Sequence, residues 1–240
     1  MAESSLVSAH GQIRFLSRYF LGRNQNLVHG AEIFADYLKD DQFVKEVEEE
    51  GATQDMFTFQ FIREAILEQF PDQARSILNG YTRMLAFDAI SGNNDRHHYN
   101  WGVVVPGHRR HEPYFSPIYD SARALFWNDE ESKLEEIKKS PDPNRLPAFI
   151  ARYVKNSRPK TGWDGANKPN HFTLIQEIYR NYPDLRSVLS DLCHQQLLQR
   201  IGQTLNGEFS PLMSPLRREM ILRCLDRRFH LFKKAISVDS

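Results

Sequence analysis

The sequence of 240 residues predicts a mainly α-helical fold that carries one small β-hairpin near its middle. Apolar residues recur at helical spacing over most of the chain. In contrast, residues 101–105 form a β-rich run, and a second β-type run at 114–120 follows a Pro-Gly turn. Hydrophobic residues make up 40% of the chain and charged residues 26%, which is ordinary for a folded domain and excludes wholesale disorder.

The length and the charge balance limit the class of protein. We expect residues 1–240 to form a single domain. Lys plus Arg and Asp plus Glu both total 31, so no global positive field favours nonspecific binding to nucleic acid. The two cysteines, Cys193 and Cys224, fall in apolar helical patterns and are expected to be reduced core residues. No apolar run approaches the ~20 residues of a membrane helix, and the acidic start is unlike a secretory signal, so we expect a cytosolic protein without membrane contact.

The first half of the chain is expected to be helical after a short strand. The helix that precedes residue 91 is apolar nearly all round in its last turns, which predicts that it is buried. An acidic patch at 46–50 is typical of a solvated helix end, with an acidic docking site as the alternative. We expect a strand over 13–21, a turn over 22–26, and helices over 31–38, 57–70 and 71–91.

The second half begins with the hairpin of residues 101–105 and 114–120. Pro117 places the second of these runs on a sheet edge or makes it irregular. Ser214 and Pro215 form an N-cap followed by a proline in the first helical position, which predicts a helix start. We expect helices over 129–139, 146–154, 172–181, 184–201 and 215–235, and a long loop over 155–170.

The most polar stretch of the sequence, residues 91–100, connects the buried helix to the hairpin. Loops that a rigid scaffold holds are where catalytic residues concentrate. Asp95 and Asn100 have the D-x-x-x-x-N spacing of protein-kinase catalytic loops, in which the aspartate orients or accepts the proton of the attacking hydroxyl. Asp120 follows the hairpin, as the second metal-binding aspartate does in kinases, and carboxylate with amide oxygen suits Mg²⁺. The alternative is a structural turn whose side chains cap backbone groups.

Residues 92–102, GNNDRHHYNWG, and residues 115–122, FSPIYDSA, resemble the HipA-like serine/threonine kinases of bacterial toxin–antitoxin systems. The motif D-R-H-x-x-N is also similar to the catalytic loop of phosphatidylinositol-kinase-like enzymes. The resemblance extends over about residues 15–235 and implies the C-terminal catalytic lobe of such a kinase. It implies that Asp95 is the catalytic aspartate, that Asn100 and Asp120 are ligands of Mg²⁺ and bind the ATP cofactor, and that His97 lies beside the phosphates.

The sequence before Asp95 departs from the kinase pattern. It contains no G-x-G-x-x-G loop and no strand lysine of the Val-Ala-Ile-Lys type. These are the two features by which the N-terminal lobe of a kinase binds the phosphates of ATP. The N-terminal lobe is therefore expected to be absent from this chain or to belong to a separate subunit. The competing interpretation is a pseudokinase or a regulatory module that binds a partner. The expected partners are a protein substrate and an antitoxin or N-lobe subunit, with nucleic acid reached only through a partner.

Two structural expectations follow from the kinase interpretation. The Asp120 carboxylate and the Asn100 amide should lie on the same face, close enough for one Mg²⁺ to contact both. The same surface should expose apolar side chains from residues 15–21 and 115–119, because a nucleotide site lies between two lobes.

Other patterns have weaker interpretations. His97 and His98 with Asp95 and Asp120 could bind Zn²⁺ or Mn²⁺ in a hydrolase, although their spacing is unlike that of known zinc motifs. Residues 108–111 are interpreted as a solvated hairpin tip, and residues 157–163 as an exposed loop or a clamp for substrate or phosphate. The basic face of the last helix is interpreted as solvated, with contact to an antitoxin, nucleic acid or partner lobe as the alternative.

Overall fold

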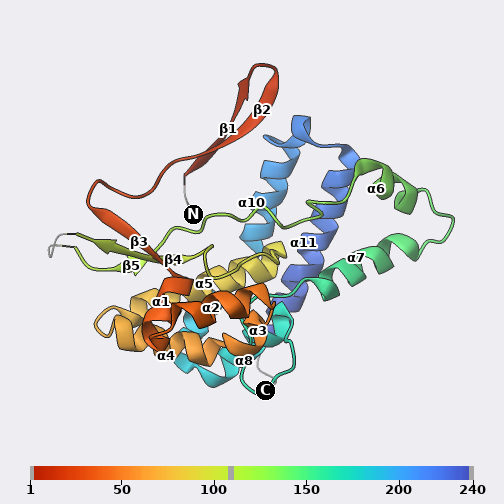
Figure 1. Ribbon diagram of the computed structural model, residues 1–240. Coiled ribbons are helices and arrows are strands. Elements are labelled where there is room, and N and C mark those ends of the chain that lie inside the picture. The colour runs from red at the N-terminus through yellow and green to blue at the C-terminus, as the bar shows by residue number, and fades with distance from the viewer. Residues whose placement is uncertain (1–2, 108–110, 238–240) are drawn as a thin grey trace.

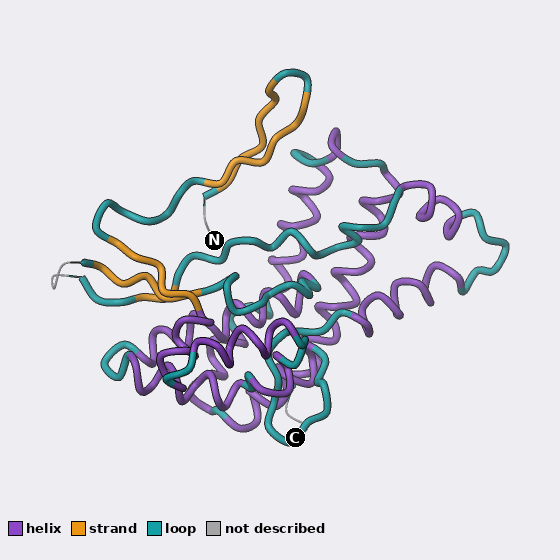
Figure 2. Tube along the Cα trace, in the orientation of Figure 1, coloured by secondary structure: helices purple, strands orange, loops and turns teal. Residues whose placement is uncertain are grey.

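The computed structural model describes residues 3–107 and 111–237, in which two small antiparallel sheets lie beside a body of helices (Figures 1 and 2). This architecture confirms the predicted fold class, mainly α with a small β-hairpin. Within the described part of the chain, no helix combines the length and the apolar character needed to span a bilayer.

The three-stranded sheet contains the predicted hairpin. Its strand order is β3-β4-β5, and β4 pairs with β5 as expected, although β5 has only two residues. At β4 an added Cβ on Gly102 would lie 2.4 Å from the Val28 carbonyl oxygen, so only glycine allows this approach of β3. The turn expected over 22–26 is wrong in part, because β3 begins at Gln25. This strand pairs with β4, which lies far away in the sequence. The strands are β3 (Gln25–His29), β4 (Gly102–Pro106) and β5 (Tyr114–Phe115).

The N-terminal hairpin, β1 (Ser4–Ala9) and β2 (Gln12–Ser17), forms a separate two-stranded sheet. It extends away from the helical body (Figure 1). Only one of these two strands was expected, because residues 4–9 lack a clear apolar alternation. Every residue of β2 is exposed; Phe15 is 68% and Tyr19 is 78% accessible to solvent. The expected apolar surface is therefore present at residues 15–21, whereas Phe115–Tyr119 is mostly half-buried.

The helical body is organised around α5 (Ala74–Ser91), whose buried residues include both its early stripe and its last turns. Helices α4, α8, α9 and α11 all contact α5. The two cysteines are free thiols; Cys224 is buried and Cys193 is half-buried. The other helices are α1 (Gly30–Leu38), α2 (Asp41–Glu49), α3 (Thr53–Met56), α4 (Phe59–Gln69), α6 (Glu131–Lys138), α7 (Arg145–Asn156), α8 (His171–Asn181), α9 (Arg186–Ser190), α10 (Gln195–Asn206) and α11 (Pro215–Ile236), with 3-10 turns η1 (Pro183–Leu185) and η2 (Ser210–Leu212).

The start of α11 follows its capping signal, but one expected helix is wrong. At the start of α11, the Ser214 hydroxyl accepts a hydrogen bond from the Arg217 amide at 3.0 Å, as the cap motif predicts. The helix expected over 184–201 is instead divided into η1, α9 and α10. The chain breaks at 191–194, so that α9 packs against both α5 and α11 while α10 packs against α11.

Candidate active site

The polar loop begins at Gly92, which ends α5 in the left-handed conformation with a φ of 79°. An added Cβ at Gly92 would lie 3.1 Å from the guanidinium of Arg228, so the position needs glycine for both its backbone angle and its packing. On the other side, the Ser157 hydroxyl donates to the Gly92 carbonyl oxygen at 2.8 Å. The start of the loop is thus fixed by α11 and by the segment after α7.

A buried ion pair holds the loop against α5. The side chain of Arg96 is 3% exposed and that of Asp88 is 1% exposed. The guanidinium donates from Nε to Asp88 Oδ2 at 2.9 Å and from Nη2 to Oδ1 at 3.0 Å, a bidentate arrangement. Asn93 continues this network, because its Nδ2 donates to Asp88 Oδ1 and its Oδ1 accepts the Asp95 amide at 3.2 Å. The backbone of Asp95 is therefore positioned by side chains that α5 anchors.

The same guanidinium also binds the segment after the hairpin. Nη1 of Arg96 donates to the carbonyl oxygens of Asn100 at 2.9 Å and of Asp120 at 3.4 Å, and also to that of Tyr119. Nη2 donates to the Ser121 hydroxyl at 2.9 Å. Because one nitrogen contacts the backbone of both Asn100 and Asp120, the main chains of these two residues lie close together. The expected approach of their side chains stays a prediction.

The side chains of Asn100 and Asp120 are a donor set that suits Mg²⁺. Nδ2 of Asn100 donates to the Asp95 carbonyl oxygen at 2.9 Å, which leaves its amide oxygen as the atom to bind a ligand. Asp120 is exposed, and no described residue forms a hydrogen bond or ion pair with its carboxylate. Its φ of 47° is left-handed, which costs a non-glycine residue about 1–3 kcal/mol and is common at functional sites. A carboxylate and an amide oxygen fit the ligand preference of magnesium.

The carboxylate of Asp95 is paired with Arg123, a contact that the sequence did not predict. Nε of Arg123 lies 3.1 Å from Oδ2 and Nη1 lies 3.3 Å from Oδ1. The guanidinium also lies over the ring of Trp127, 5.2 Å from its centroid. Arg123 and Trp127 line a cavity of about 370 Å³ next to Asn94. The partner of Asp95 therefore borders this cavity, while Asp95 itself is half-buried and follows Asn94 in the chain.

The two histidines of the loop have different surroundings. His97 is half-buried, and its Nδ1 accepts the Tyr99 amide at 3.3 Å. His98 is fully buried, with ring centroids 4.8 Å from Phe34 and 5.0 Å from Phe57, and burial lowers the pKa of His98 to about 3. The hydrolase alternative is wrong, because His98 belongs to the core. The described residues contain no group of three His, Cys, Asp or Glu side chains placed to hold a metal.

Two further expectations change with the structure. Residues 157–163 are not an exposed loop, since they are tied to the core, while a role as a clamp for substrate or phosphate stays a prediction. Thr161 shares a hydrogen bond of 2.6 Å with the Tyr81 hydroxyl, and the Gly162 amide donates to the Phe57 carbonyl oxygen at 3.1 Å. On the last helix, Arg228 is buried rather than solvated. The solvated hairpin tip was predicted over residues 108–111. Of these, residues 108–110 lie outside the described part of the chain.

Sequence reasoning proposed Asp95, His97, Asn100 and Asp120 as site residues, but it did not assign a role to Asp88 or Arg96. A signal for Asp88 was present, because a carboxylate in the apolar last turns of a buried helix needs a buried partner. Nothing in the sequence identifies that partner among the chain's many cations.

The fold of this chain belongs to the kinase-like class, as comparison with known proteins shows. No protein-family model matches the sequence, and no curated protein matches it. Among solved structures, the fold is similar to the crystal structure of CtkA, a proinflammatory kinase from Helicobacter pylori. The TM-score is 0.74 at 19% sequence identity, and the match covers 100% of this chain and 78% of that chain. The similarity therefore extends over the whole chain and establishes the fold.

Proposed function

We propose that this chain is the catalytic lobe of a HipA-like serine/threonine protein kinase that uses ATP and Mg²⁺. The observation that carries the proposal is the guanidinium of Arg96, which holds the loop of Asp95 and Asn100 and the segment of Asp120 together. Kinase chemistry needs these two segments side by side. The solved kinase of similar fold supports the same class of reaction.

In this proposal the attacking oxygen of a protein Ser or Thr forms a bond to the γ-phosphorus of ATP, while the bond from that phosphorus to the ADP oxygen breaks. Asp95 orients the hydroxyl and accepts its proton. The Asn100 amide oxygen and the Asp120 carboxylate would hold Mg²⁺, which neutralises charge on the phosphates when it is bound. His97 would contact the phosphates. Because the protein does little covalent chemistry, positioning and charge stabilisation account for the rate.

The N-terminal part of the chain bears on how ATP is held. The sequence before Asp95 has no glycine-rich loop or strand lysine, and the exposed hairpin β1–β2 supplies neither. We propose that a further lobe or subunit covers the nucleotide, and that the chain by itself binds ATP weakly without measurable kinase activity. The partners proposed with it are a protein substrate and an antitoxin in the cytoplasm, with nucleic acid contacted only through a partner.

The proposal is tested by calorimetric titration of ATP into the full chain, with and without Mg²⁺. Asp120→Asn should weaken Mg-ATP binding at least about tenfold, or about 1.4 kcal/mol, because the metal loses a charged ligand. Asp55→Asn, at an exposed acid of α3, is the matched control and should leave binding unchanged. Equal affinity of wild type and Asp120→Asn for Mg-ATP contradicts the assigned metal site.

Catalysis is tested once the covering lobe is supplied. Asp95→Asn should retain most of the Mg-ATP affinity and lose phosphoryl transfer by orders of magnitude, because the substitution keeps the shape and removes the proton acceptor. Near-normal turnover by Asp95→Asn would show that the role given to Asp95 is wrong.

The second candidate function is a pseudokinase or regulatory module that binds a partner through this lobe. The missing ATP-gripping motifs favour it. The two functions differ in one result: a pseudokinase complex assembled with its partner lobe shows no transfer that depends on Asp95.

A further inference from the structure

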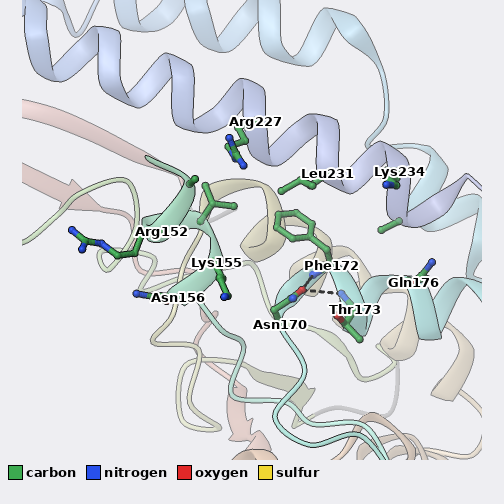
Figure 3. A pocket seen from close by; sticks show the side chains of 13 residues that line it. Arg152, Lys155, Asn156, Asn170, Phe172, Thr173, Gln176, Arg227, Leu231 and Lys234 are labelled. Carbon is green, nitrogen blue, oxygen red and sulfur yellow. Dashed lines mark hydrogen bonds between the residues drawn. The ribbon is translucent and has the colours of Figure 1, made fainter. Parts of the chain in front are cut away.

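A cavity of about 750 Å³ lies between α7, α8 and α11 (Figure 3). Neither Asp95, Asn100 nor Asp120 lines it, although Arg152 and Asn156 also line the cavity of about 370 Å³ next to Asn94. Its volume falls within the range of small-ligand pockets, roughly 300–1,000 Å³. The cavity is therefore large enough for a second ligand of the size of a mononucleotide.

Helical spacing brings the lining residues together. On α11, Arg227, Leu231 and Lys234 are four and three residues apart and lie on one face. The same spacing puts Phe172 and Gln176 on one face of α8. Figure 3 shows these residues around one space, with Phe172 between the two helices. The lining therefore combines an apolar wall with charged groups.

The charged side chains that the described residues contribute to this cavity all have the same sign. Arg152 and Lys155 of α7 join Arg227 and Lys234 of α11, and no carboxylate from residues 3–107 or 111–237 lines the cavity. None of these four cations forms an ion pair with a described residue. By contrast, Arg217 of the same α11 is paired with Glu131. Four unpaired positive charges around one cavity favour an anionic ligand, which would relieve their mutual repulsion.

The first turn of α8 does not supply the recognition of charge. Its cap residue Asn170 accepts the amides of Phe172 at 2.9 Å and of Thr173 at 3.0 Å, so these two donors are already occupied. The anionic group of a ligand is therefore bound by the Arg and Lys side chains, which bind phosphate through several donors. The amides of Asn156 and Gln176 remain as polar groups that can hydrogen-bond the edge of a ring or a sugar.

The apolar wall rests on a buried cation. The guanidinium carbon of Arg228 lies 5.2 Å from the centroid of the Phe172 ring. Arg228 also donates from Nη1 to the carbonyl oxygen of Val154, another lining residue, at 3.5 Å, and from Nε to that of Ala89 at 2.8 Å. Its Nη2 is buried without a partner in the described part of the chain. Phe172 is thus held in a fixed position, as a surface for stacking requires.

We propose that this cavity binds a small organic phosphate with a planar apolar body, of which a mononucleotide is the simplest example. The phosphate contacts the Arg and Lys side chains, and the ring lies against Phe172 and Leu231. Because the protein itself supplies the positive charge, binding does not require a divalent cation. The residues assigned to Mg-ATP in the proposed function do not line this cavity, so the two sites can be tested with separate variants.

The test is a titration of AMP into the full chain in the presence of EDTA, which removes divalent cations. We expect one saturable site. Adenosine and inorganic phosphate should each bind at least about tenfold more weakly than AMP, because each lacks one of the two recognised parts. Arg227→Glu and Lys155→Glu should each lower AMP affinity at least about tenfold. Arg200→Glu, at an exposed arginine of α10 outside the cavity, is the matched control and should bind AMP like the wild type.

Several results would overturn the proposal. These are the absence of saturable AMP binding, equal AMP affinity in Arg227→Glu and Arg200→Glu, and inorganic phosphate that binds as tightly as AMP. Arg227→Gln checks that the reversed charge has not simply disturbed α11, and it should also weaken binding. Loss of AMP binding in Asp120→Asn would place AMP at the candidate active site and refute the cavity. Mg-ATP binding that depends on Asp120 can fail or succeed without affecting any of these outcomes.

Discussion

Although Arg96→Lys keeps the positive charge, we expect this substitution to lower the free energy of unfolding substantially. Arg96 donates to six acceptors from a buried position: both oxygens of Asp88, three backbone carbonyl oxygens and the Ser121 hydroxyl. A lysine ammonium has three protons to donate and cannot form the bidentate contact. The loss of about three hydrogen bonds at about 0.5–1.5 kcal/mol each lowers the free energy of unfolding by about 2–4 kcal/mol.

The measurement is urea unfolding, followed by the fluorescence of the three tryptophans. The midpoint should fall while the slope stays unchanged, because the same surface is exposed on unfolding. Arg75→Lys, at an exposed position of α5, should change the stability by no more than about 0.5 kcal/mol. The lysine variant should also bind Mg-ATP more weakly, since the backbone of Asp120 loses its anchor. A stability loss below about 1 kcal/mol for Arg96→Lys would refute the view that this guanidinium holds the site together.

Two further predictions concern the loop that Arg96 anchors. Gly92→Ala should destabilise the protein by about 1–2 kcal/mol or more, because residue 92 has a left-handed backbone and contacts a buried arginine. Gly165→Ala, where φ is 80° and nothing lies within 4 Å of the added Cβ, should show the backbone cost alone. Equal unfolding free energies for the two variants would contradict this prediction. The pKa of His98 is lowered to about 3, so below pH 6.5 the unfolded state takes up a proton that the folded state does not. His98 alone should therefore lower the free energy of unfolding by up to about 2 kcal/mol between pH 8 and pH 5. In His98→Gln the free energy of unfolding should depend less steeply on pH, but some dependence should remain because burial lowers the pKa of His171 as well. If urea unfolding at several pH values gives the same pH dependence for His98→Gln and the wild type, His98 is not the titrating group.

The helices that the sequence predicted best are those with a strong local signal. The stripe of α4, the apolar last turns of α5 and the Ser214 cap of α11 each depend on residues within a few positions of each other. The strand β3 was missed because its pairing partner β4 lies more than seventy residues away, so its polar composition resembles a turn. The break before α10 was missed for the same reason, since packing against α5 and α11 decides it.

The candidate site shows the same division between local and distant information. The spacing of Asp95 and Asn100 is local, and Asp120 was added because it follows a hairpin, as the second metal-binding aspartate does in kinases. The pairing of Asp95 with Arg123 and the burial of His98 depend on how separate segments meet, and spacing alone does not determine them. A motif thus identified the acidic and amide groups, while the cations that hold or neutralise them came from the structure.

The position of Arg96 explains why the motif and the fold depend on each other. Its neighbour Asp95 is half-buried, whereas the side chain of Arg96 is 3% exposed and points inward. There it meets Asp88, a buried carboxylate that would destabilise α5 without a partner. The remaining donors of the same guanidinium reach the segment of Asp120, so the interaction that neutralises a core charge also fixes the metal-binding candidate. The site could not lose this arginine without also destabilising the helix that supports it.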